Sequence, residues 1–214
     1  MNCCQCQGIE ELFNEKLVSK ELSSYRIKGP SKTTRMLTDA LKKEGIQGLA
    51  LLDIGGGVGA IQHDLLAAGV QNATDVDASQ AYLKAAKAEA QRRGLTDRVS
   101  FQHGNFVDIA AQIPPADIVT LDRVICCYSD MENLVSSSVS RARKLYGVVY
   151  PRDLWWIKLG IRVINFFSRL QKSPFRSFAH PTQAVEAIIH KHGFRQRFYG
   201  HTLVWQVVVY SRLN

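Results

Sequence analysis

The feature that most restricts the fold of this chain is a glycine-rich loop in its first third. An apolar run at 51–54 leads directly into the sequence GGGVG at 55–59, and a helix-forming segment follows. Glycines at such a junction let the backbone approach a ligand closely, and the helix N-terminus attracts negative charge. Asp77 ends the next expected strand, where a carboxylate can accept hydrogen bonds from both hydroxyls of a ribose. The pattern predicts a nucleoside-binding site.

Around this loop the sequence alternates between short apolar runs and helical segments. We expect strands at 49–54, 73–76, 98–102, 116–121, 145–150, 194–199 and 202–211. We expect helices at 8–28, 31–44, 58–68, 79–93, 107–112, 131–143, 154–170 and 182–192. This alternation predicts an α/β fold, a doubly wound, mainly parallel seven-stranded sheet. Only two residues separate the last two strands, which predicts a C-terminal antiparallel hairpin.

Two cofactor classes bind at a glycine loop with an acidic partner. Gly55-x-Gly57-x-x-Ala60 also matches the dinucleotide fingerprint, so an NAD-dependent oxidoreductase is one alternative. Asp53 argues against a pyrophosphate, because a carboxylate there suits the ammonium end of an amino-acid-bearing cofactor. The third glycine, Gly59, and the closing hairpin also favour S-adenosylmethionine.

These residues make the chain resemble class I S-adenosylmethionine-dependent methyltransferases over residues 30–214. The first motif of that family, acidic-x-Gly-x-Gly-x-Gly, is similar to the sequence from Asp53 to Gly59. The resemblance implies a Rossmann-like methyltransferase fold, with an N-terminal helical cap at 1–45 and the methyltransferase domain at 46–214. It also implies an enzyme with S-adenosyl-L-methionine as its cofactor.

The resemblance assigns a set of cofactor-binding residues. Asn105 and Phe106 stand where family members place the residues near the adenine. Asp122 and Arg123 follow the fourth expected strand, in the loop that lines the sulfonium side of the pocket in that family. The residues expected to bind the cofactor are Asp53, Gly55, Gly56, Gly57, Gly59, Asp77, Ala78, Asn105, Phe106, Asp122 and Arg123.

The net charge of +8 is concentrated in one region. Residues 141–176 carry nine basic side chains and one acidic side chain, whereas residues 1–140 carry 14 basic and 17 acidic ones. In the helix expected at 154–170, four polar residues fall within about 60° of arc on an otherwise apolar surface. These residues are Lys158, Arg162, Asn165 and Arg169.

The helix expected at 154–170 is too short and too charged to cross a bilayer. It can pack in the core, cover an apolar pocket, or contact an anionic membrane surface together with the residues up to 176. A nucleic-acid partner, and with it an RNA methyltransferase, is less favoured because no aromatic side chains alternate with the cations of the stripe. A non-catalytic, membrane-peripheral cofactor-binding protein is a further alternative.

The C-terminal third carries a weaker similarity to magnesium-protoporphyrin O-methyltransferases. It lies in Tyr-Pro-Arg at 150–152 and Ser-Pro-Phe-Arg at 173–176. Where that family tends to have His-Tyr after the fourth strand, this chain has Ile-Cys-Cys-Tyr at 125–128. The similarity implies a porphyrin-like carboxylate as the acceptor. More broadly, we expect a small apolar or anionic acceptor, with a thiol as the alternative. The candidate catalytic residues are Tyr128, Arg152 and His180.

Five cysteines fall in two clusters, Cys3, Cys4 and Cys6 and then Cys126 and Cys127. Their odd number and the lack of a secretory signal predict reduced thiols and a cytoplasmic protein, peripheral to a membrane if the basic region contacts one. The first cluster contains a CxxC, but no second pair completes a zinc pattern. We interpret the second cluster as small buried hydrophobic residues and expect no metal site. If the N-terminal end folds over the pocket, however, four or five thiols converge there.

Overall fold

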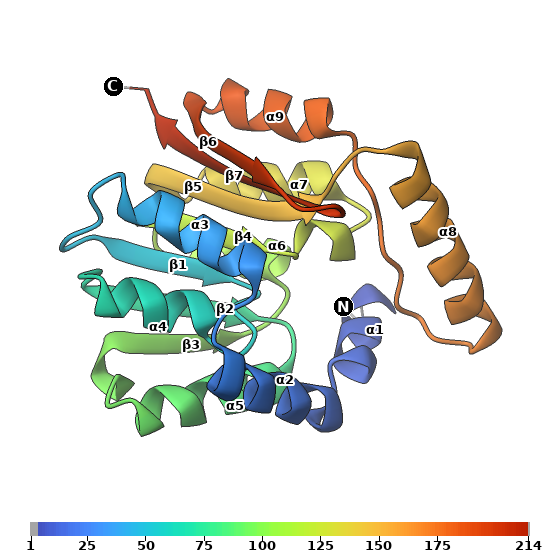
Figure 1. The fold of residues 1–214 in the computed structure, drawn as a ribbon, viewed down its shortest axis with the longest axis horizontal. Helices are drawn as coiled ribbons and strands as arrows, with labels where there is room; N and C mark the ends of the chain where they lie inside the picture. Colours follow the sequence, from blue (N-terminus) through green and yellow to red (C-terminus); the bar gives the residue numbers. More distant parts are fainter. Residues whose placement is uncertain (1–3, 214) are drawn as a thin grey trace.

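The fold is taken from a computed structural model, which describes residues 4–213, with side chains from residue 8 onward. Seven strands form one sheet with helices on both faces (Figure 1). The strands are β1 (Ala50–Ile54), β2 (Asn72–Asp77), β3 (Val99–His103), β4 (Ala116–Asp122), β5 (Ala142–Pro151), β6 (Phe194–His201) and β7 (Trp205–Arg212). The α-helices are α1 (Cys4–Leu12), α2 (Glu15–Lys28), α3 (Lys32–Lys42), α4 (Ala60–Ala67), α5 (Gln80–Arg92), α6 (Phe106–Ile109), α7 (Met131–Val139), α8 (Trp155–Leu170) and α9 (Thr182–Lys191).

The strand order is β3-β2-β1-β4-β5-β7-β6. Neighbouring strands are parallel from β3 through β5, and β7 runs antiparallel to both β5 and β6. The predicted α/β class, the mainly parallel sheet and the closing hairpin are therefore confirmed. The order reverses direction between β1 and β4, and in open α/β sheets ligands bind beyond the carboxyl ends of the strands at such a point.

The core lies in two layers, one on each face of the sheet. Leu52 and Ile54 face the layer that contains α6, α7 and α9, whereas Leu51 faces the layer that contains α3 and α4. This alternation follows from the two-residue period of a strand. The central strands β4 and β5 are buried on both faces, which is why they form nearly continuous apolar runs.

The prediction of one continuous helix over 8–28 is wrong, because the chain forms two helices there. Asn14 separates α1 from α2, and its side-chain oxygen accepts hydrogen bonds from the backbone N–H of Lys16 and Leu17, each at 3.2 Å. Asn is a favoured N-cap residue because it satisfies amide groups that have no partner within the helix. The break lets α1 turn toward the carboxyl edge of the sheet (Figure 1).

A buried carboxylate holds α2 against α5. Glu89 is fully buried and accepts hydrogen bonds from Arg26 at 2.9 Å, Arg92 at 2.6 Å and Arg93 at 2.8 Å. These guanidinium groups hold the pKa of the Glu89 carboxyl well below its usual range. The N-terminal helices are thus fixed on the domain, and the proposed division into a cap at 1–45 and a domain at 46–214 stays a prediction.

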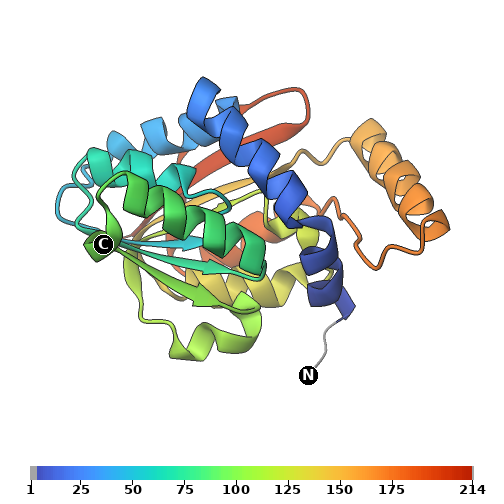
Figure 2. The same cartoon turned by 90° about the horizontal axis from the view of Figure 1, so that it is seen from below.

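Helix α8 lies apart from the sheet at one end of the molecule (Figures 1 and 2). Ile157 is its only buried residue, so the core interpretation of 154–170 is wrong. The segment from 171 to 181, which we call the strap, runs back from α8 to α9. No helix among residues 4–213 combines the length and apolar character needed to cross a bilayer.

Candidate cofactor and acceptor site

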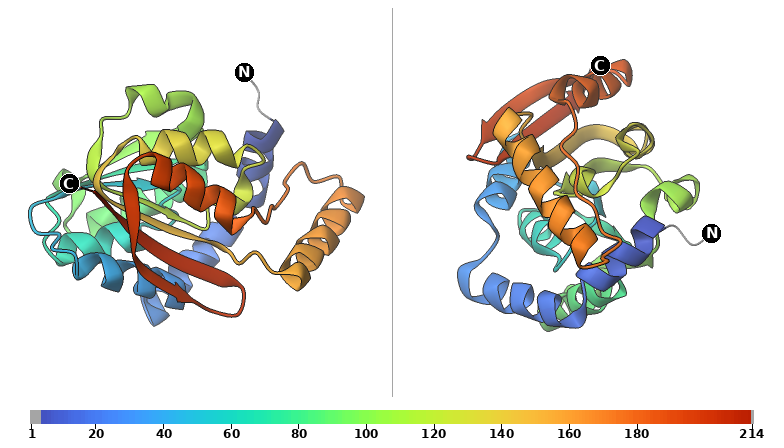
Figure 3. Two further views of the ribbon diagram at one scale, coloured as in Figure 1. Left: turned by 90° about the horizontal axis from the view of Figure 1, so that it is seen from above. Right: turned by 90° about the vertical axis from the view of Figure 1, so that its right-hand side faces the viewer.

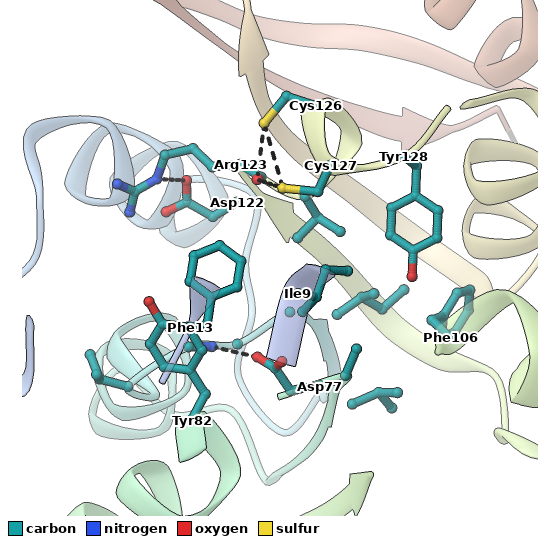
Figure 4. Close-up of a pocket in the computed structure, with 18 of the residues that line it drawn as sticks. Ile9, Phe13, Asp77, Tyr82, Phe106, Asp122, Arg123, Cys126, Cys127 and Tyr128 are labelled. Atoms are coloured by element: carbon teal, nitrogen blue, oxygen red, sulfur yellow. Dashed lines mark hydrogen bonds and ion pairs between the residues drawn. The ribbon is translucent and has the colours of Figure 1, made fainter. Parts of the chain in front are cut away.

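A cavity of about 380 Å³ lies beyond the carboxyl ends of β1, β2 and β4, where the strand order reverses (Figure 4). Helix α1 and the strap contribute further walls, and α2, α3, α5 and β7 contribute one residue each. Among the residues predicted from the sequence, the cavity is lined by Gly55, Gly56, Gly57, Asp77, Ala78, Phe106, Asp122, Arg123 and Tyr128. The fold therefore brings most of the predicted site together.

The glycine loop is closely packed against the structure behind it. Gly55 has φ of +67°, and a Cβ there would lie 2.5 Å from Cγ2 of Val124. A Cβ on Gly56 would overlap the side chains of Gln62 and Asp75. Residues with a side chain are excluded by space at both positions and by backbone conformation at Gly55. The loop backbone itself thus forms the cavity floor.

Asp77 lies at the end of β2 and is almost fully buried. Its carboxylate accepts hydrogen bonds from the backbone N–H of Gly57 at 3.2 Å and of Ser79 at 2.8 Å. Burial raises the pKa of Asp77 to about 6, and these two hydrogen bonds limit the rise. A cavity-lining carboxylate held beside the loop fits the predicted contact with ribose hydroxyls.

Asp53 and Gly59 lie behind the loop and outside the cavity lining. Asp53 Oδ1 accepts a hydrogen bond from the Thr120 hydroxyl at 2.7 Å, and Oδ2 accepts one from Gln62 at 3.2 Å. Burial raises the pKa of Asp53 to about 7. Gly59 occupies the N-cap of α4 with φ of +80°. Direct contact of either residue with the cofactor stays a prediction.

The acceptor-side candidates are spread over three environments. The Tyr128 hydroxyl, on the cavity wall, donates a hydrogen bond to Asn105 Oδ1, so Asn105 lies behind Tyr128. His180 Nε2 lies 2.7 Å from the Tyr128 carbonyl oxygen and therefore supports the same turn. Arg152 donates to the backbone carbonyls of Thr202 and Leu203. Asn105, Arg152 and His180 are outside the cavity lining, and their predicted roles stay predictions.

Several lining residues were not predicted from the sequence because they come from the N-terminal segment that precedes the sheet. Ile9, Leu12 and Phe13 line the cavity, and Phe13 packs against the Tyr82 ring with centroids 5.4 Å apart. Their i, i+3, i+4 spacing is the signal of a helix with one apolar face. Thr34 of α3 also lines the cavity, and its hydroxyl donates to Asp122 Oδ2 at 2.5 Å, which joins α3 to the end of β4.

The strap covers the cavity together with α1. The Phe175 and Phe13 rings meet edge to face, with centroids 6.0 Å apart. A Cβ on Gly8 would lie 2.7 Å from the Phe175 backbone nitrogen, so the two backbones are in direct contact. The two segments therefore form a common wall, which Ser177 continues.

Cys126 and Cys127 both line the cavity. Cys126 is buried, which agrees with the interpretation from sequence, whereas Cys127 is half-buried. The hydrogen bond from Cys127 lowers the pKa of the Cys126 thiol, and the same interaction with burial raises the pKa of Cys127. Of the N-terminal cysteines, Cys3 lies outside the described residues, and Cys4 and Cys6 are described only as backbone of α1.

Comparison with known proteins agrees with this geometry. Residues 51–149 match the family described as Methyltransferase domain. No curated protein matches the sequence significantly. Magnesium protoporphyrin IX methyltransferase from Synechocystis PCC 6803 with bound SAH has a similar structure, with a TM-score of 0.73, 19% identity, and coverage of 98% of this chain and 100% of that one. The structure of the same protein with bound SAM has a TM-score of 0.72 and 16% identity, and the match covers 98% of this chain and 97% of that one.

An O-methyltransferase family protein from Burkholderia thailandensis is also similar, with a TM-score of 0.69, 13% identity, and coverage of 94% of this chain and 61% of that one. At these identities the structural likeness shows the fold. The matched domain contains both the glycine loop and Asp77, and the loop leaves no room for side chains at Gly55 and Gly56. These residues fit S-adenosylmethionine as the cofactor. Residues 51–149 therefore form a methyltransferase domain, and the chain has the fold of class I S-adenosylmethionine-dependent methyltransferases.

Proposed function

We propose that this methyltransferase acts on a small apolar or anionic acceptor, with a porphyrin-like carboxylate as the first candidate and a thiol as the second. The observation that carries the proposal is the single cavity that joins the glycine loop and Asp77 to an apolar wall with Tyr128. S-adenosylmethionine, when bound, supplies an electrophilic methyl group. A carboxylate or thiolate acceptor is already nucleophilic, so the chain need not provide a general base.

The residues of the chain then act mainly by binding and positioning. The glycine loop and Asp77 hold the nucleoside end, Asp122 and Arg123 lie on the sulfonium side, and Tyr128 borders the space left for the acceptor. Helix α1 and the strap exclude water, because Phe13 and Phe175 close over the cavity. Orientation of two reactants in a site closed to water accounts for large rate enhancements without acid–base chemistry.

Two observations support a flat, anionic, apolar acceptor. The structural likeness to the protein named magnesium protoporphyrin IX methyltransferase extends over almost the whole chain, including α8 and the strap. The surface beside the cavity combines apolar side chains of α8 with cations, since α8 carries Lys158, Arg162 and Arg169 and the strap carries Lys172 and Arg176. Such a surface suits a molecule that partitions into membranes and carries carboxylates.

The acceptor class is tested by supplying S-adenosylmethionine with magnesium protoporphyrin IX, its dimethyl ester or a small thiol, and measuring S-adenosylhomocysteine formation. We expect turnover with the free carboxylate and none with the dimethyl ester. Arg152→Gln should raise KM for the anionic acceptor, whereas the exposed Arg195→Gln on β6 serves as a charge-matched control. Turnover of the thiol alone would contradict the carboxylate proposal.

We further propose that α8 contacts an anionic membrane surface. Six large apolar side chains of α8 fall within about 120° of arc and are 48–76% exposed. They are Trp155, Leu159, Val163, Phe166, Phe167 and Leu170. The stripe of Lys158, Arg162 and Arg169 borders one edge of this face, so the cations can reach lipid headgroups while the apolar face enters the interface.

The polar stripe of α8 is also tied to the cavity wall through Asn165. The Asn165 side chain donates to the Ser177 carbonyl at 2.8 Å and accepts from the Ser177 N–H at 2.9 Å. Because Ser177 lines the cavity, contact of α8 with a membrane would bring the acceptor side close to that surface. This arrangement suits an acceptor dissolved in the bilayer.

Membrane contact is tested by cosedimentation with vesicles of phosphatidylglycerol and phosphatidylcholine. We expect binding that falls with salt, that is lost with phosphatidylcholine alone, and that is lost when Lys158, Arg162 and Arg169 are changed to Gln. A control with the exposed Lys87, Lys191 and Arg195 changed to Gln removes the same charge elsewhere and should still bind. Equal loss in both triple variants would contradict a site on α8.

A further inference from the structure

Two thiols to which the proposed methyl transfer assigns no role lie side by side on the cavity wall (Figure 4). The Sγ atoms of Cys126 and Cys127 are 4.0 Å apart, and both lie near the Arg123 carbonyl oxygen, at 3.2 Å and 3.6 Å. Neighbouring side chains in a strand would point to opposite faces. Here the short 3₁₀ turn at Ile125–Cys127 curls the backbone and brings both sulfur atoms to the same side.

The two thiols differ in acidity, which suits one of them to attack and the other to resolve. The hydrogen bond from Cys127, assisted by the positive charge of Arg123, lowers the pKa of the Cys126 thiol. The same interaction, together with burial, raises the pKa of Cys127. The thiolate is the nucleophilic form of cysteine, and a low-pKa thiol beside a resolving thiol is typical of redox-sensitive pairs.

A small reagent can reach the pair through the cavity. Cys126 is buried from the outer surface and Cys127 is half-buried, but both line the cavity of about 380 Å³. A water molecule occupies about 30 Å³ in the liquid, so a small neutral hydroperoxide fits this space. The apolar side chains of Val124 and Phe106 on the same wall favour a neutral reagent over a charged one.

We propose that Cys126 and Cys127 are a redox modification site, which hydroperoxides convert into a disulfide between adjacent residues that reshapes the cavity wall. The Cys126 thiolate attacks one oxygen of the peroxide, the O–O bond breaks, and Cys126 becomes a sulfenic acid as water or an alcohol leaves. The Cys127 sulfur then attacks the Cys126 sulfur. The S–S bond forms, and the sulfenic oxygen leaves as water with the proton of Cys127. The thiols are oxidised and the hydroperoxide is reduced.

A disulfide between these neighbours is strained and therefore reversible. Their Cα atoms are about 3.8 Å apart across a trans peptide bond, whereas ordinary disulfides join Cα atoms about 4.4–6.8 Å apart. The sulfur atoms must also move from 4.0 Å to about 2.05 Å. Strained disulfides have more oxidising potentials than structural ones, so a dithiol reductant should restore the thiols.

Closing the disulfide must change the turn that carries it. The Cys127 N–H donates to the Val124 carbonyl at 2.8 Å, and the Phe178 N–H of the strap donates to the Cys126 carbonyl at 2.8 Å. Figure 3 shows the strap crossing from α8 to α9 with α1 beside it. Tyr128 follows the pair directly, so oxidation displaces both the strap and an acceptor-side residue. This inference does not depend on which acceptor is methylated.

The spacing of basic residues allows the disulfide to be located by mass spectrometry. Trypsin releases the peptide 124–141, which contains Cys126 and Cys127, whereas the other three cysteines fall in the peptide 1–16. The full chain, reduced and folded, is treated with hydrogen peroxide, alkylated with N-ethylmaleimide and digested. We expect the peptide 124–141 without alkylation and lighter by two hydrogen atoms, and its full alkylation after dithiothreitol.

Matched variants separate the two cysteine clusters. Cys3→Ser/Cys4→Ser/Cys6→Ser leaves the turn untouched and should form the same disulfide as the wild type, whereas Cys127→Ser should not form it. Full alkylation of the peptide 124–141 after peroxide would overturn the proposal. So would a disulfide that joins this peptide to the peptide 1–16. The wild type and the N-terminal triple variant decide the matter even if Cys127→Ser fails to fold.

Hydrogen–deuterium exchange tests the effect on the cavity wall. The strap should exchange faster in the oxidised wild type than in the reduced one, because the Phe178 amide loses its partner, whereas α5 should exchange equally in both. Equal exchange of the strap in the two states would overturn the proposed change of shape. Neither readout involves methyl transfer, so failure of this inference and failure of the proposed function are distinguishable.

Discussion

The carboxylate of Asp77 accepts a hydrogen bond from the backbone N–H of Gly57 at 3.2 Å, which ties the end of β2 to the glycine loop after β1. The same carboxylate lines the cavity. It therefore both supports the loop and presents its charge to a ligand. The glycine loop and Asp77, which are 18 or more residues apart in the sequence, are therefore joined in the structure into one binding site.

Replacing this carboxylate should weaken cofactor binding. Asp77→Asn keeps the size of the side chain but removes the charge, and a hydrogen bond to a charged group contributes about 1.5–3 kcal/mol. We expect the Kd of S-adenosylhomocysteine to rise about 10- to 100-fold by calorimetry. Asp97→Asn, at an exposed site, is the matched control and should bind like the wild type. Unchanged affinity in Asp77→Asn would contradict the assigned role.

The glycine loop should not tolerate a methyl group at Gly56. A Cβ there would overlap Gln62 and Asp75, and such overpacking costs about 1–3 kcal/mol. We expect Gly56→Ala to lower the free energy of unfolding by that amount in urea and to abolish binding of S-adenosylhomocysteine. Gly160→Ala, in α8, meets no atom within 4 Å and should be neutral or stabilising. Full binding by Gly56→Ala would contradict the packing described.

Asp75 should make stability depend on pH. It is completely buried, and neither of its carboxylate oxygens has a well-formed hydrogen bond within residues 8–213. Burial raises its pKa well above 3.8, so the folded state keeps a proton that the unfolded state releases above about pH 4. Stability from this group is therefore complete at low pH and falls as pH rises toward the folded-state pKa.

Asp75→Asn should remove that dependence, because an amide stays neutral at every pH. We expect the variant to match the wild type near pH 4 and to exceed it increasingly at higher pH, measured by urea unfolding of the ligand-free protein. Asp97→Asn provides the exposed control. A stability difference that does not change with pH would show that Asp75 is ionised in the folded state.

Tyr128 should affect methyl transfer more than cofactor binding. Its hydroxyl holds Asn105 and lies on the cavity wall, so Tyr128→Phe loses one hydrogen bond without changing the ring. We expect kcat/KM for the acceptor to fall about threefold to tenfold while the Kd of S-adenosylhomocysteine stays the same. Tyr199→Phe, on the exposed side of β6, should change neither quantity. An equal loss of cofactor affinity would assign Tyr128 to the cofactor instead.

The sheet was predictable because its signals are local. Apolar runs at 51–54 and 116–121 alternate with helices whose starts are capped locally, because Ser31 and Ser79 accept hydrogen bonds from the backbone N–H of Thr34 and Tyr82. Even the antiparallel position of the last strands follows from the short connection between them. The break at Asn14 also has a local cause, the capping hydrogen bonds of its side chain. The polar segment around it, however, has no clear helical repeat of apolar residues that would mark where one helix ends and the next begins.

The cavity walls were less predictable because they depend on contacts between distant segments. Nothing near Phe175 in the sequence indicates that it packs on Phe13, and Gly8 gives no sign that it touches the strap. The position of Asp53 was equally hidden, because its partners Thr120 and Gln62 come from β4 and α4. Such contacts arise from the tertiary fold and not from any one motif.

The identity of the cofactor is the central claim, and calorimetry tests it directly. The purified chain is titrated with S-adenosylhomocysteine and, separately, with NADH. The glycine loop, Asp77 and the methyltransferase domain predict saturable binding of S-adenosylhomocysteine at a single site and no binding of NADH. Binding of NADH with no heat from S-adenosylhomocysteine would contradict the account.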